Sequence, residues 1–445
     1  MRAKAIFFLF FLTFFLANSS NWTLREIMWP IKFAMLALFV GYVLVELFNR
    51  QTTLQRAVPI YPLLSLAFFS LINLFSLFTL RSSWKYARIL GIEPEHGYAL
   101  LLGFILIYLF AMQLARFLAP VRYQAAFLSA MNSAAALVTF SNLLLYALGI
   151  NLGRGADAGL AMRFSGWLDN PNTLGVILLG AFPFVLISAL RSKGALDSIE
   201  WILLFSMLVL TLLTGSRSAA LGMSVIAVLF VWHVSGSARS ALFFTALTIG
   251  ILTVLQDNAG DLLSYFPQFA REGKDILSGR SEAWKLGWKL FTERPFQGYG
   301  IGSEQVIIAK LMPPDAVHQG INFHNSYLSL LVMGGLPGAV PFFLLLGAAM
   351  KNALRILTGE TYKTGIFDLL MSTLFCGLFF HAFFESWIFA PGSVYGVIFW
   401  TACFWLLSGR QVPVEAGKKR QRQISGRRQV ASAPASCSGR PSCSG

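Results

Sequence analysis

The strongest constraint on this chain is a series of apolar segments that recurs from one end to the other. A hydrocarbon core about 30 Å thick needs roughly 20 apolar residues for each helix that crosses it. Because lipid offers no hydrogen-bond partner to the backbone, each segment is expected to form a helix. The predicted spans cover residues 5–17, 31–48, 58–80, 98–118, 125–149, 173–190, 199–214, 219–234, 241–255, 326–348, 367–389 and 392–408.

The composition also indicates a polytopic membrane protein. Of the 445 residues, 56% are hydrophobic and only 12% are charged, whereas soluble domains carry about 25% charged residues. We therefore predict an all-α polytopic membrane protein with about twelve transmembrane helices. The first span is short, and because it follows Arg2 and Lys4 it also resembles a secretory signal; an uncleaved first helix is the preferred interpretation.

The distribution of positive charge predicts the orientation. A net charge of +15 could indicate nucleic-acid binding, but eight of the 35 Lys and Arg residues lie in the last 36 positions, and others flank apolar segments. With a cytoplasmic N-terminus, the cytoplasmic side carries 20 of them and the short outer connections carry 8. Both termini are therefore predicted to be cytoplasmic. The basic tail, residues 409–445, is predicted to be disordered and close to anionic lipid.

The spans divide the chain into four parts. Residues 1–255 form spans one to nine, residues 256–323 form a large outer loop, residues 324–408 form the last three spans, and the tail follows. The loop is too long for a simple connector, so it is predicted to be a subdomain that carries the functional surface. Within it, Trp284, Trp288 and Phe291 follow helical spacing, and Pro295 ends the predicted helix. This helix is expected to lie flat on the membrane surface.

Three residues of the outer face could carry chemistry. His324 lies where the loop meets an apolar segment, and an imidazole at that boundary can act as a base. Arg217, in a short turn, and Arg280, in the loop, present planar guanidinium groups that suit a diphosphate. The alternatives are that the histidine only caps its helix and that each arginine only anchors a helix to lipid headgroups.

Other polar residues give weaker signals. His381 and Glu385 are four residues apart on the eleventh predicted span, which predicts one shared helix face and either a functional role or an ion pair that locks helices. Asp169, Asn170 or Asn172, just before the sixth span, could cap it. No set of residues predicts a metal site. Gly298, Gly300 and Gly302 lack the βαβ context of a dinucleotide site, and the chain has no phosphate-loop motif.

Taken together, these motifs resemble the O-antigen ligase and polymerase superfamily of bacterial inner-membrane glycosyltransferases. The marker of that family is a histidine followed by Asn, Ser or Arg, then nine residues and Gly-x-x-Gly, which His324, Asn325, Gly335 and Gly338 match. The segments GSRSA, GRSEAW, ERPFQGYGIGS and DNPNTLG are similar to family features in the same order. The resemblance covers roughly residues 160–345 in motifs and the whole chain in its number of spans.

The resemblance implies a GT-C-like fold with a periplasmic loop subdomain and an inverting reaction at the periplasmic face of the inner membrane. It implies undecaprenyl diphosphate as the carrier of the donor glycan, a hydroxyl of the lipid A core as the acceptor, and no metal ion or other cofactor. By motif, Arg217 and Arg280 would bind the diphosphate, His324 would be the base, and Asn325 would contact substrate. His381, Glu385, Asp169 and Asn172 are candidate supporting residues. Membrane lipids are expected partners; nucleic acid is not.

Two other functions remain open from the sequence. A repeat-unit polymerase, which joins one lipid-linked glycan to another, shares similar arginines and topology. A transporter or flippase for lipid-linked sugars would need a charged pathway through the membrane and often has repeated halves. The sequence shows no convincing internal repeat, and its polar features gather on one face, so a ligase is the preferred prediction.

Overall fold

The structure, a computed structural model, describes most of the bundle and part of the outer loop. The described residues are 2–16, 18, 22–49, 56–57, 59–83, 94–152, 163–191, 198–235, 280–311, 322–359, 365–390 and 393–410. The helices are α1 (Arg2–Leu16), α2 (Trp22–Asn49), α3 (Tyr61–Ser83), α5 (Pro94–Phe117), α6 (Val121–Ala147), α7 (Pro171–Arg191), α8 (Ser198–Thr214), α9 (Arg217–Ser235), α12 (Arg280–Glu293), α13 (Ser303–Leu311), α14 (Ser326–Leu357), α15 (Ile366–His381) and α16 (Val394–Leu407). Two-residue strands β1 (Arg56–Ala57) and β2 (Gly409–Arg410) pair antiparallel.

The described part of the chain is a polytopic helical membrane protein. Six of its helices are long and apolar enough to cross a membrane, and four shorter helices are also apolar. The long ones are α3, α5, α6, α7, α9 and α14, and the shorter ones are α1, α8, α15 and α16. The predicted helical class is confirmed, while the total of twelve spans stays a prediction, because the span at 241–255 lies outside the described residues.

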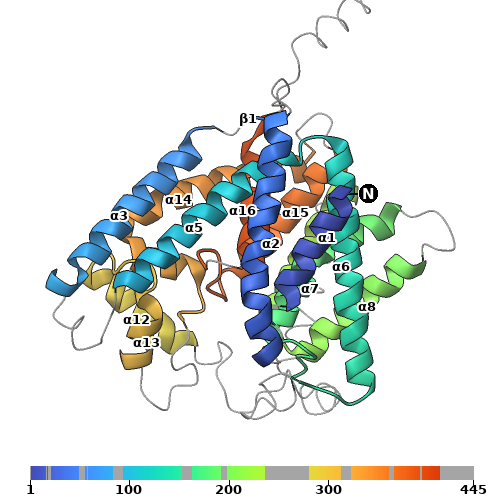
Figure 1. Cartoon of the computed structure of the whole chain (residues 1–445), viewed down its shortest axis with the longest axis horizontal. Helices are drawn as coiled ribbons and strands as arrows, with labels where there is room; N and C mark the ends of the chain where they lie inside the picture. Colours follow the sequence, from blue (N-terminus) through green and yellow to red (C-terminus); the bar gives the residue numbers. More distant parts are fainter. Residues whose placement is uncertain are drawn as a thin grey trace, which may run out of the picture.

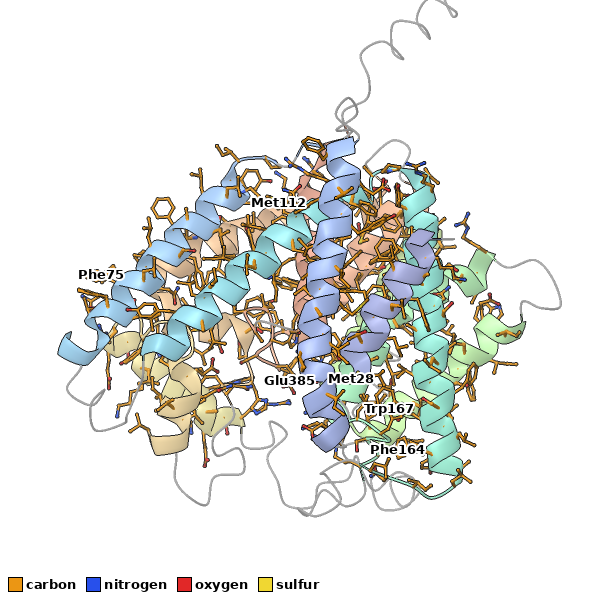
Figure 2. All side chains as sticks on the ribbon, in the orientation of Figure 1. Met28, Phe75, Met112, Phe164, Trp167 and Glu385 are labelled. Carbon is orange, nitrogen blue, oxygen red and sulfur yellow. The ribbon has the colours of Figure 1, made fainter. Side chains whose placement is uncertain are left out.

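The two ends of the bundle differ. Figure 1 shows α12 and α13 at one end of the molecule and β1, paired with β2, at the other. The start of α1 lies nearer the β1 end. Figure 2 places Glu385 at the α12 end, together with Trp167 and Phe164, and Met112 toward the opposite end. Chemically distinctive side chains from distant parts of the sequence therefore gather at one end of the bundle.

Aromatic side chains fill the core between α3, α5, α14 and α16. The rings of Phe69, Phe104, Phe342 and Trp400 form successive contacts, with centroid distances of 5.2 Å between Phe69 and Phe342 and 5.5 Å between Phe342 and Trp400. Ring pairs at such distances add to the free energy gained from burial. This packing fixes the position of α14 within the bundle.

Small residues bring α9 and α15 close together. A Cβ added at Gly222 would lie 3.2 Å from the carbonyl oxygen of Gly377, and a Cβ at Gly377 would lie 3.2 Å from that of Gly222. In lipid, close backbone approach of this kind replaces the hydrophobic effect as a source of helix association. The contact brings the first residues of α9 next to the last residue of α15, where Ser218 Oγ and His381 Nε2 are 3.4 Å apart.

A kink in α14 holds the outer segment that follows α12. Gly335 has φ 56° and ψ −168°, a conformation that only glycine adopts readily. The kink turns the Leu336 N–H away from its helical partner, and it donates to Pro295 O at 2.7 Å. Pro337 has no N–H to offer. The two α14 carbonyls that lose their partners, Val332 O and Met333 O, accept from Tyr299 and Gly300 N–H, both at 2.9 Å.

The outer segment has its own small hydrophobic core. It joins α12, α13 and the start of α14 through Ala283, Leu290, Phe291, Tyr299, Ile307, Ile308, Phe323, Leu328 and Val332. Of the aromatic residues of α12, Phe291 is buried in this core, whereas Trp288 is 57% exposed. The buried face of α12 also includes Ala283, Gly287 and Leu290. That this helix lies flat on the membrane surface stays a prediction.

Candidate active site

The partly buried carboxylate of Glu385 lies at the centre of the polar cluster. Its Oε1 accepts from Arg280 Nη2 at 2.8 Å and from Asn172 Nδ2 at 3.2 Å. Its Oε2 lies 3.0 Å from His324 Nδ1. Residues that the sequence separates by as many as 213 positions thus meet at one side chain.

The local fold around Glu385 corrects a sequence prediction. Span eleven was predicted to continue to residue 389, with His381 and Glu385 on one face. Instead, α15 ends at His381, and residues 382–390 leave the helix. The first turn of α14 replaces their helical hydrogen bonds: Ser326 N–H donates to Ala382 O, and Ser326 Oγ donates to Glu385 O and accepts from Trp387 N–H. Glu385 can therefore point toward His324.

The backbone of His324 is strained, and its neighbours hold it in place. Its φ of 50° is positive, and it is the one non-glycine residue with positive φ in the described part of the chain. Such a conformation costs on the order of 1–3 kcal/mol and clusters at functional sites. The His324 N–H donates to Asn322 Oδ1, and the N–H of Asn325 donates to Ser386 Oγ. Asn325 Oδ1 caps α14 by accepting from Tyr327 and Leu328 N–H.

Hydrogen bonding sets the tautomer of His324. Burial raises the pKa of Glu385, but the hydrogen bond and charge of His324 and the charge of Arg280 outweigh that effect and hold the pKa at about 2. The carboxylate is therefore ionised at neutral pH and can only accept. His324 Nδ1 must carry the proton in this bond, so the lone pair of a neutral ring is on Nε2. This is the arrangement by which a carboxylate orients a histidine general base.

A second arginine, Arg163, supports Glu385 indirectly, through Asn172. Arg163 is 7% exposed, and its Nη2 donates to Asn172 Oδ1 at 2.6 Å while its Nε donates to Thr214 O at 2.7 Å. Because the Asn172 oxygen is occupied by the arginine, its Nδ2 is directed to Glu385. Asn172 follows Pro171, which opens α7 in the position where a missing N–H costs nothing. The predicted supporting residue Asn172 therefore lies at the site.

Arg217 lies beside the same cluster. It is the first residue of α9, after a turn in which Gly215 has φ 59°. The charge of Arg280 acts on Arg217, so the two guanidinium groups lie within electrostatic range of each other. The free N–H groups of a helix N-terminus add partial positive charge at this point. Two arginines and a helix N-terminus together make this part of the site strongly attractive to an anion.

His381 belongs to a separate contact. Its Nδ1 accepts from Trp387 Nε1 at 2.9 Å, so Nε2 carries the proton and faces Ser218 Oγ. It is 1% exposed. His381 therefore ties the ends of α15 and α9 to the segment that carries Glu385, and no hydrogen bond joins it to Glu385 itself. Asp169, another predicted supporting residue, lies two residues before the start of α7, and its backbone N–H donates to Asn18 O.

Part of the chain that contributes to this cluster is similar to a known protein family. Residues 202–343 match a family model described as Wzy_C, O-antigen ligase. This stretch is similar to the O-antigen ligase domain. The resemblance to the O-antigen ligase and polymerase superfamily is thereby confirmed. A comparison with curated proteins finds no match.

The stretch that matches the O-antigen ligase model contains part of the cluster and not all of it. Arg217, Arg280 and His324 lie inside residues 202–343, as does Gly335 at the kink of α14. Glu385, which joins Arg280 to His324, lies 42 residues beyond the last matched position, counted from 343 to 385. The segment between α15 and α16 therefore completes the polar cluster of the domain.

Sequence reasoning missed two features of this site. No local sequence pattern distinguishes Arg163 from the other basic residues of the outer connections, because its contacts with Thr214 and Asn172 depend on the folded structure. The pairing of Glu385 with His324 was also missed, because the apolar sequence around residue 385 looks like a continuous span. One signal was present: a glutamate within an apolar segment is costly and points to a specific partner.

Proposed function

We propose that the chain is a membrane glycosyltransferase of the O-antigen ligase type. It transfers a glycan from undecaprenyl diphosphate to a hydroxyl of the lipid A core and uses no metal ion or other cofactor. The observation that carries the proposal is the Glu385 carboxylate, which contacts both the candidate base, His324, and a candidate diphosphate ligand, Arg280. The match to the O-antigen ligase family supports the same reaction class.

The proposed reaction begins with the acceptor hydroxyl. His324 Nε2 takes the hydroxyl proton as the oxygen forms a bond to the anomeric carbon of the donor sugar. The bond from that carbon to the diphosphate oxygen breaks, and its electron pair leaves with undecaprenyl diphosphate. Attack occurs on the face opposite the leaving group, so the configuration at the anomeric carbon inverts. Glu385 stabilises the imidazolium that forms, through its hydrogen bond to Nδ1.

The two arginines act on the leaving group. Negative charge grows on the diphosphate as the glycosidic bond breaks, and donors already in place stabilise it without reorganisation. Arg280 uses Nη2 for Glu385, while its buried Nε has no hydrogen-bond partner among the described residues and is proposed to donate to the diphosphate. Arg217 approaches from the start of α9. Positioning and charge stabilisation suffice for this role because diphosphate is already a good leaving group.

The architecture that accompanies this function is also a proposal. We propose twelve spans in a GT-C-like arrangement in the bacterial inner membrane, with both termini cytoplasmic and the site facing the periplasm. Two observations support it. The site lies at the end of the bundle opposite the β1–β2 pair (Figures 1 and 2). The charge distribution along the sequence favours the same orientation.

Substitution of the proposed base tests the function. The protein, reconstituted with a glycan on undecaprenyl diphosphate and a lipid A-core acceptor, should transfer the glycan to lipid A. His324→Ala should reduce the rate by at least about 10²–10⁴-fold, the range for loss of a general base. His233→Ala is the matched control, because His233 lies in the last turn of α9, with its Nδ1 3.2 Å from Leu357 O. A fully active His324→Ala protein would contradict the proposal, and glycan extended on the carrier lipid would favour the polymerase.

A further inference from the structure

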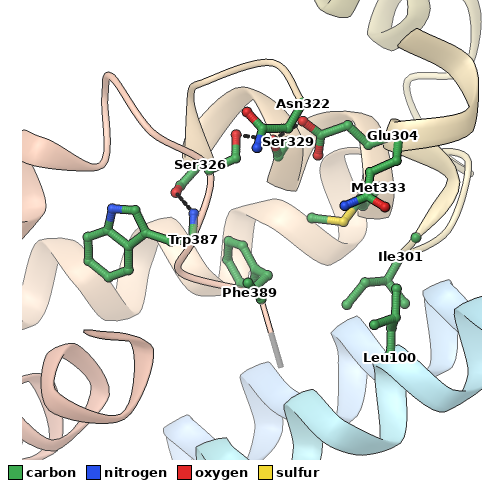
Figure 3. Close-up of a pocket in the computed structure, with 13 residues that line it drawn as sticks. Leu100, Ile301, Glu304, Asn322, Ser326, Ser329, Met333, Trp387 and Phe389 are labelled. Atoms are coloured by element: carbon green, nitrogen blue, oxygen red, sulfur yellow. Dashed lines mark hydrogen bonds between the residues drawn. The ribbon is translucent and has the colours of Figure 1, made fainter. Parts of the chain in front are cut away.

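A second polar region lies behind the segment that carries Glu385. It is a cavity of about 120 Å³ between α13, the first turns of α14 and residues 386–390. Figure 3 shows its two different walls. The polar side chains are those of Glu304, Gln305, Asn322, Ser326, Ser329 and Ser386, and the apolar ones are those of Leu100, Ile301, Met333, Trp387, Phe389 and Ala390.

The polar wall is an ordered chain of hydrogen bonds. Asn325 N–H donates to Ser386 Oγ at 2.9 Å, and Ser329 Oγ donates to Glu304 Oε1 at 2.9 Å. The two serine oxygens are 3.0 Å apart. Because the single hydroxyl proton of Ser329 points to Glu304, Ser386 must be the donor between the serines. Phe323 N–H also donates to Glu304 Oε1. Every proton in the chain therefore points toward Glu304.

The chain of hydrogen bonds is built for binding rather than for proton transfer. It ends at a backbone N–H of Asn325, which cannot pass a proton to His324. Both protein donors to Glu304 bond to Oε1. A carboxylate has about four lone-pair sites on two oxygens, so Oε2 can accept from a ligand in the cavity. Asn322 and Gln305 add amide groups that both donate and accept.

The two walls restrict the chemistry of the occupant. Among the residues that the structure describes, no Lys or Arg lines the cavity, and the carboxylate would repel a phosphate. An acyl chain would leave the polar wall without hydrogen bonds, at a cost for each buried group. A sugar ring meets both walls, because its hydroxyls can donate to carboxylate and hydroxyl oxygens while its C–H face packs on apolar side chains. One water molecule needs about 10–15 Å³ of cavity volume. The cavity of about 120 Å³ therefore has room for several waters and is large enough for a sugar ring.

We propose that this cavity is a sugar-binding subsite in which Glu304 accepts hydrogen bonds from ring hydroxyls. The inference rests on the proposed transferase function, which supplies two sources of the sugar: the acceptor core and the donor glycan. Asn322 and Ser326 each lie two residues from His324, and Ser386 follows Glu385 directly. Residues that line the cavity therefore flank the proposed base on both sides in the chain.

Glu304→Gln tests the subsite in the reconstituted full-length protein. The amide oxygen can still accept from Phe323 and Ser329, but an NH2 group replaces the oxygen that faces the ligand. Loss of a hydrogen bond to a charged acceptor should raise the KM for one substrate by roughly tenfold, with kcat nearly unchanged. A change in the acceptor KM identifies the core sugar, and a change in the donor KM identifies the donor glycan. Glu282→Gln, an exposed carboxylate on α12, is the matched control.

A second variant keeps the test decisive if Glu304→Gln folds poorly. Ala390 lines the cavity from an exposed position, so Ala390→Phe should block the space without removing any hydrogen bond of the polar wall. It should raise the same KM, whereas Ala390→Ser should not. Unchanged KM values for both substrates in folded Glu304→Gln and Ala390→Phe would overturn the subsite. If His324→Ala is inactive in the same assay, the transferase proposal stands even though the subsite is refuted. If His324→Ala is active, the transferase proposal itself is refuted.

Discussion

Two carboxylates of the polar region, the partly buried Glu385 and the buried Glu304, have different surroundings. Glu385 has Arg280 and His324 as direct partners. Within the described part of the chain, Glu304 accepts from the neutral donors Phe323 N–H and Ser329 Oγ, with the charge of His324 acting as a weaker influence. Burial raises the pKa of Glu304 to about 7, whereas cationic partners hold the pKa of Glu385 at about 2.

The contrast shows how one residue type can serve two purposes in one protein. A permanently ionised carboxylate can fix the tautomer of a histidine and balance two positive charges. A carboxylate that ionises near neutral pH, among hydroxyls and amides, is suited to binding neutral polar groups. Environments that drive two pKa values apart are a general way to assign different roles to similar residues.

Glu385→Gln should have the largest effect, because it removes the ionised carboxylate that contacts both His324 and Arg280. A glutamine side chain can donate as well as accept, so it no longer requires His324 Nδ1 to carry the proton. Arg280 also loses its ion pair. We expect kcat to fall by about 10³-fold or more, as when the carboxylate that orients a catalytic histidine is replaced by an amide. Initial rates of glycan transfer measure the effect. A kcat similar to that of Glu304→Gln would contradict the assignment of separate roles.

Gly335→Ala should damage both carboxylate regions through the kink they share. An added Cβ would lie 2.7 Å from Pro295 O, and φ at this position is 56°. We expect a loss of about 3 kcal/mol in stability, from a strained backbone and a clash with main-chain atoms. Thermal unfolding in detergent measures it. Gly338→Ala is the control, because its Cβ would meet Phe69 at 3.5 Å, an ordinary contact; equal losses for the two would show that the kink has no special role.

Arg217→Lys should have an intermediate effect, confined to the Glu385 side. Lysine keeps the charge but loses the planar fork that binds two phosphate oxygens. We expect kcat/KM for the donor to fall about 30-fold, which corresponds to about 2 kcal/mol of lost transition-state stabilisation. Arg122→Lys is the control variant. Arg122 is exposed at the start of α6, where its guanidinium group lies over the ring of Tyr123. Equal activities of the two variants would argue against a diphosphate contact at Arg217.

The smallest expected effect is a pH dependence of stability that distinguishes the two carboxylates. The native pKa of Glu304, about 7, exceeds its ordinary value of 4.5. The stability that Glu304 contributes is therefore fully present below pH 4.5 and is lost as the pH rises through 7. The reverse holds for Glu385, whose contribution is lost only as the pH falls toward 2.

Glu304→Gln removes the titrating group and so tests this difference. Relative to the unsubstituted protein, the variant should gain about 1 kcal/mol of stability between pH 6 and pH 8. Unfolding midpoints at several pH values measure the gain, with Glu282→Gln as the reference for an exposed carboxylate. A constant difference across this range would mean that Glu304 does not titrate there.

Much of the fold could be predicted from the sequence because local features mark the spans. Residues 173–190 were predicted where α7 covers 171–191, and residues 199–214 where α8 covers 198–214. Apolar length and the proline and small polar residues at the ends carry that information. The end of α15 was mispredicted, because the residues after His381 stay apolar and their replacement hydrogen bonds come from Ser326, 59 positions away from Glu385.

The site was predictable in its residue types and not in its connections. His324, Arg217 and Arg280 stood out because charged or titratable groups beside apolar segments need a reason to be there. Their predicted catalytic and binding roles stay predictions. Glu385 as the shared partner of two of them, and Arg163 as the support of Asn172, depend on long-range packing that no local pattern encodes.

The backbone bonds between the kink of α14 and residues 295–300 have a mechanical consequence. They join the helix that begins with Arg280 to the helix that begins after His324, so these two residues belong to one rigid unit. Arg217 is on α9, which packs mainly against α15 and α7 and less against α14. Relative movement of α9 and α14 therefore changes the distance from Arg217 to the other two residues more than the distance between Arg280 and His324. A bulky lipid-linked substrate is expected to enter and leave on the α9 side.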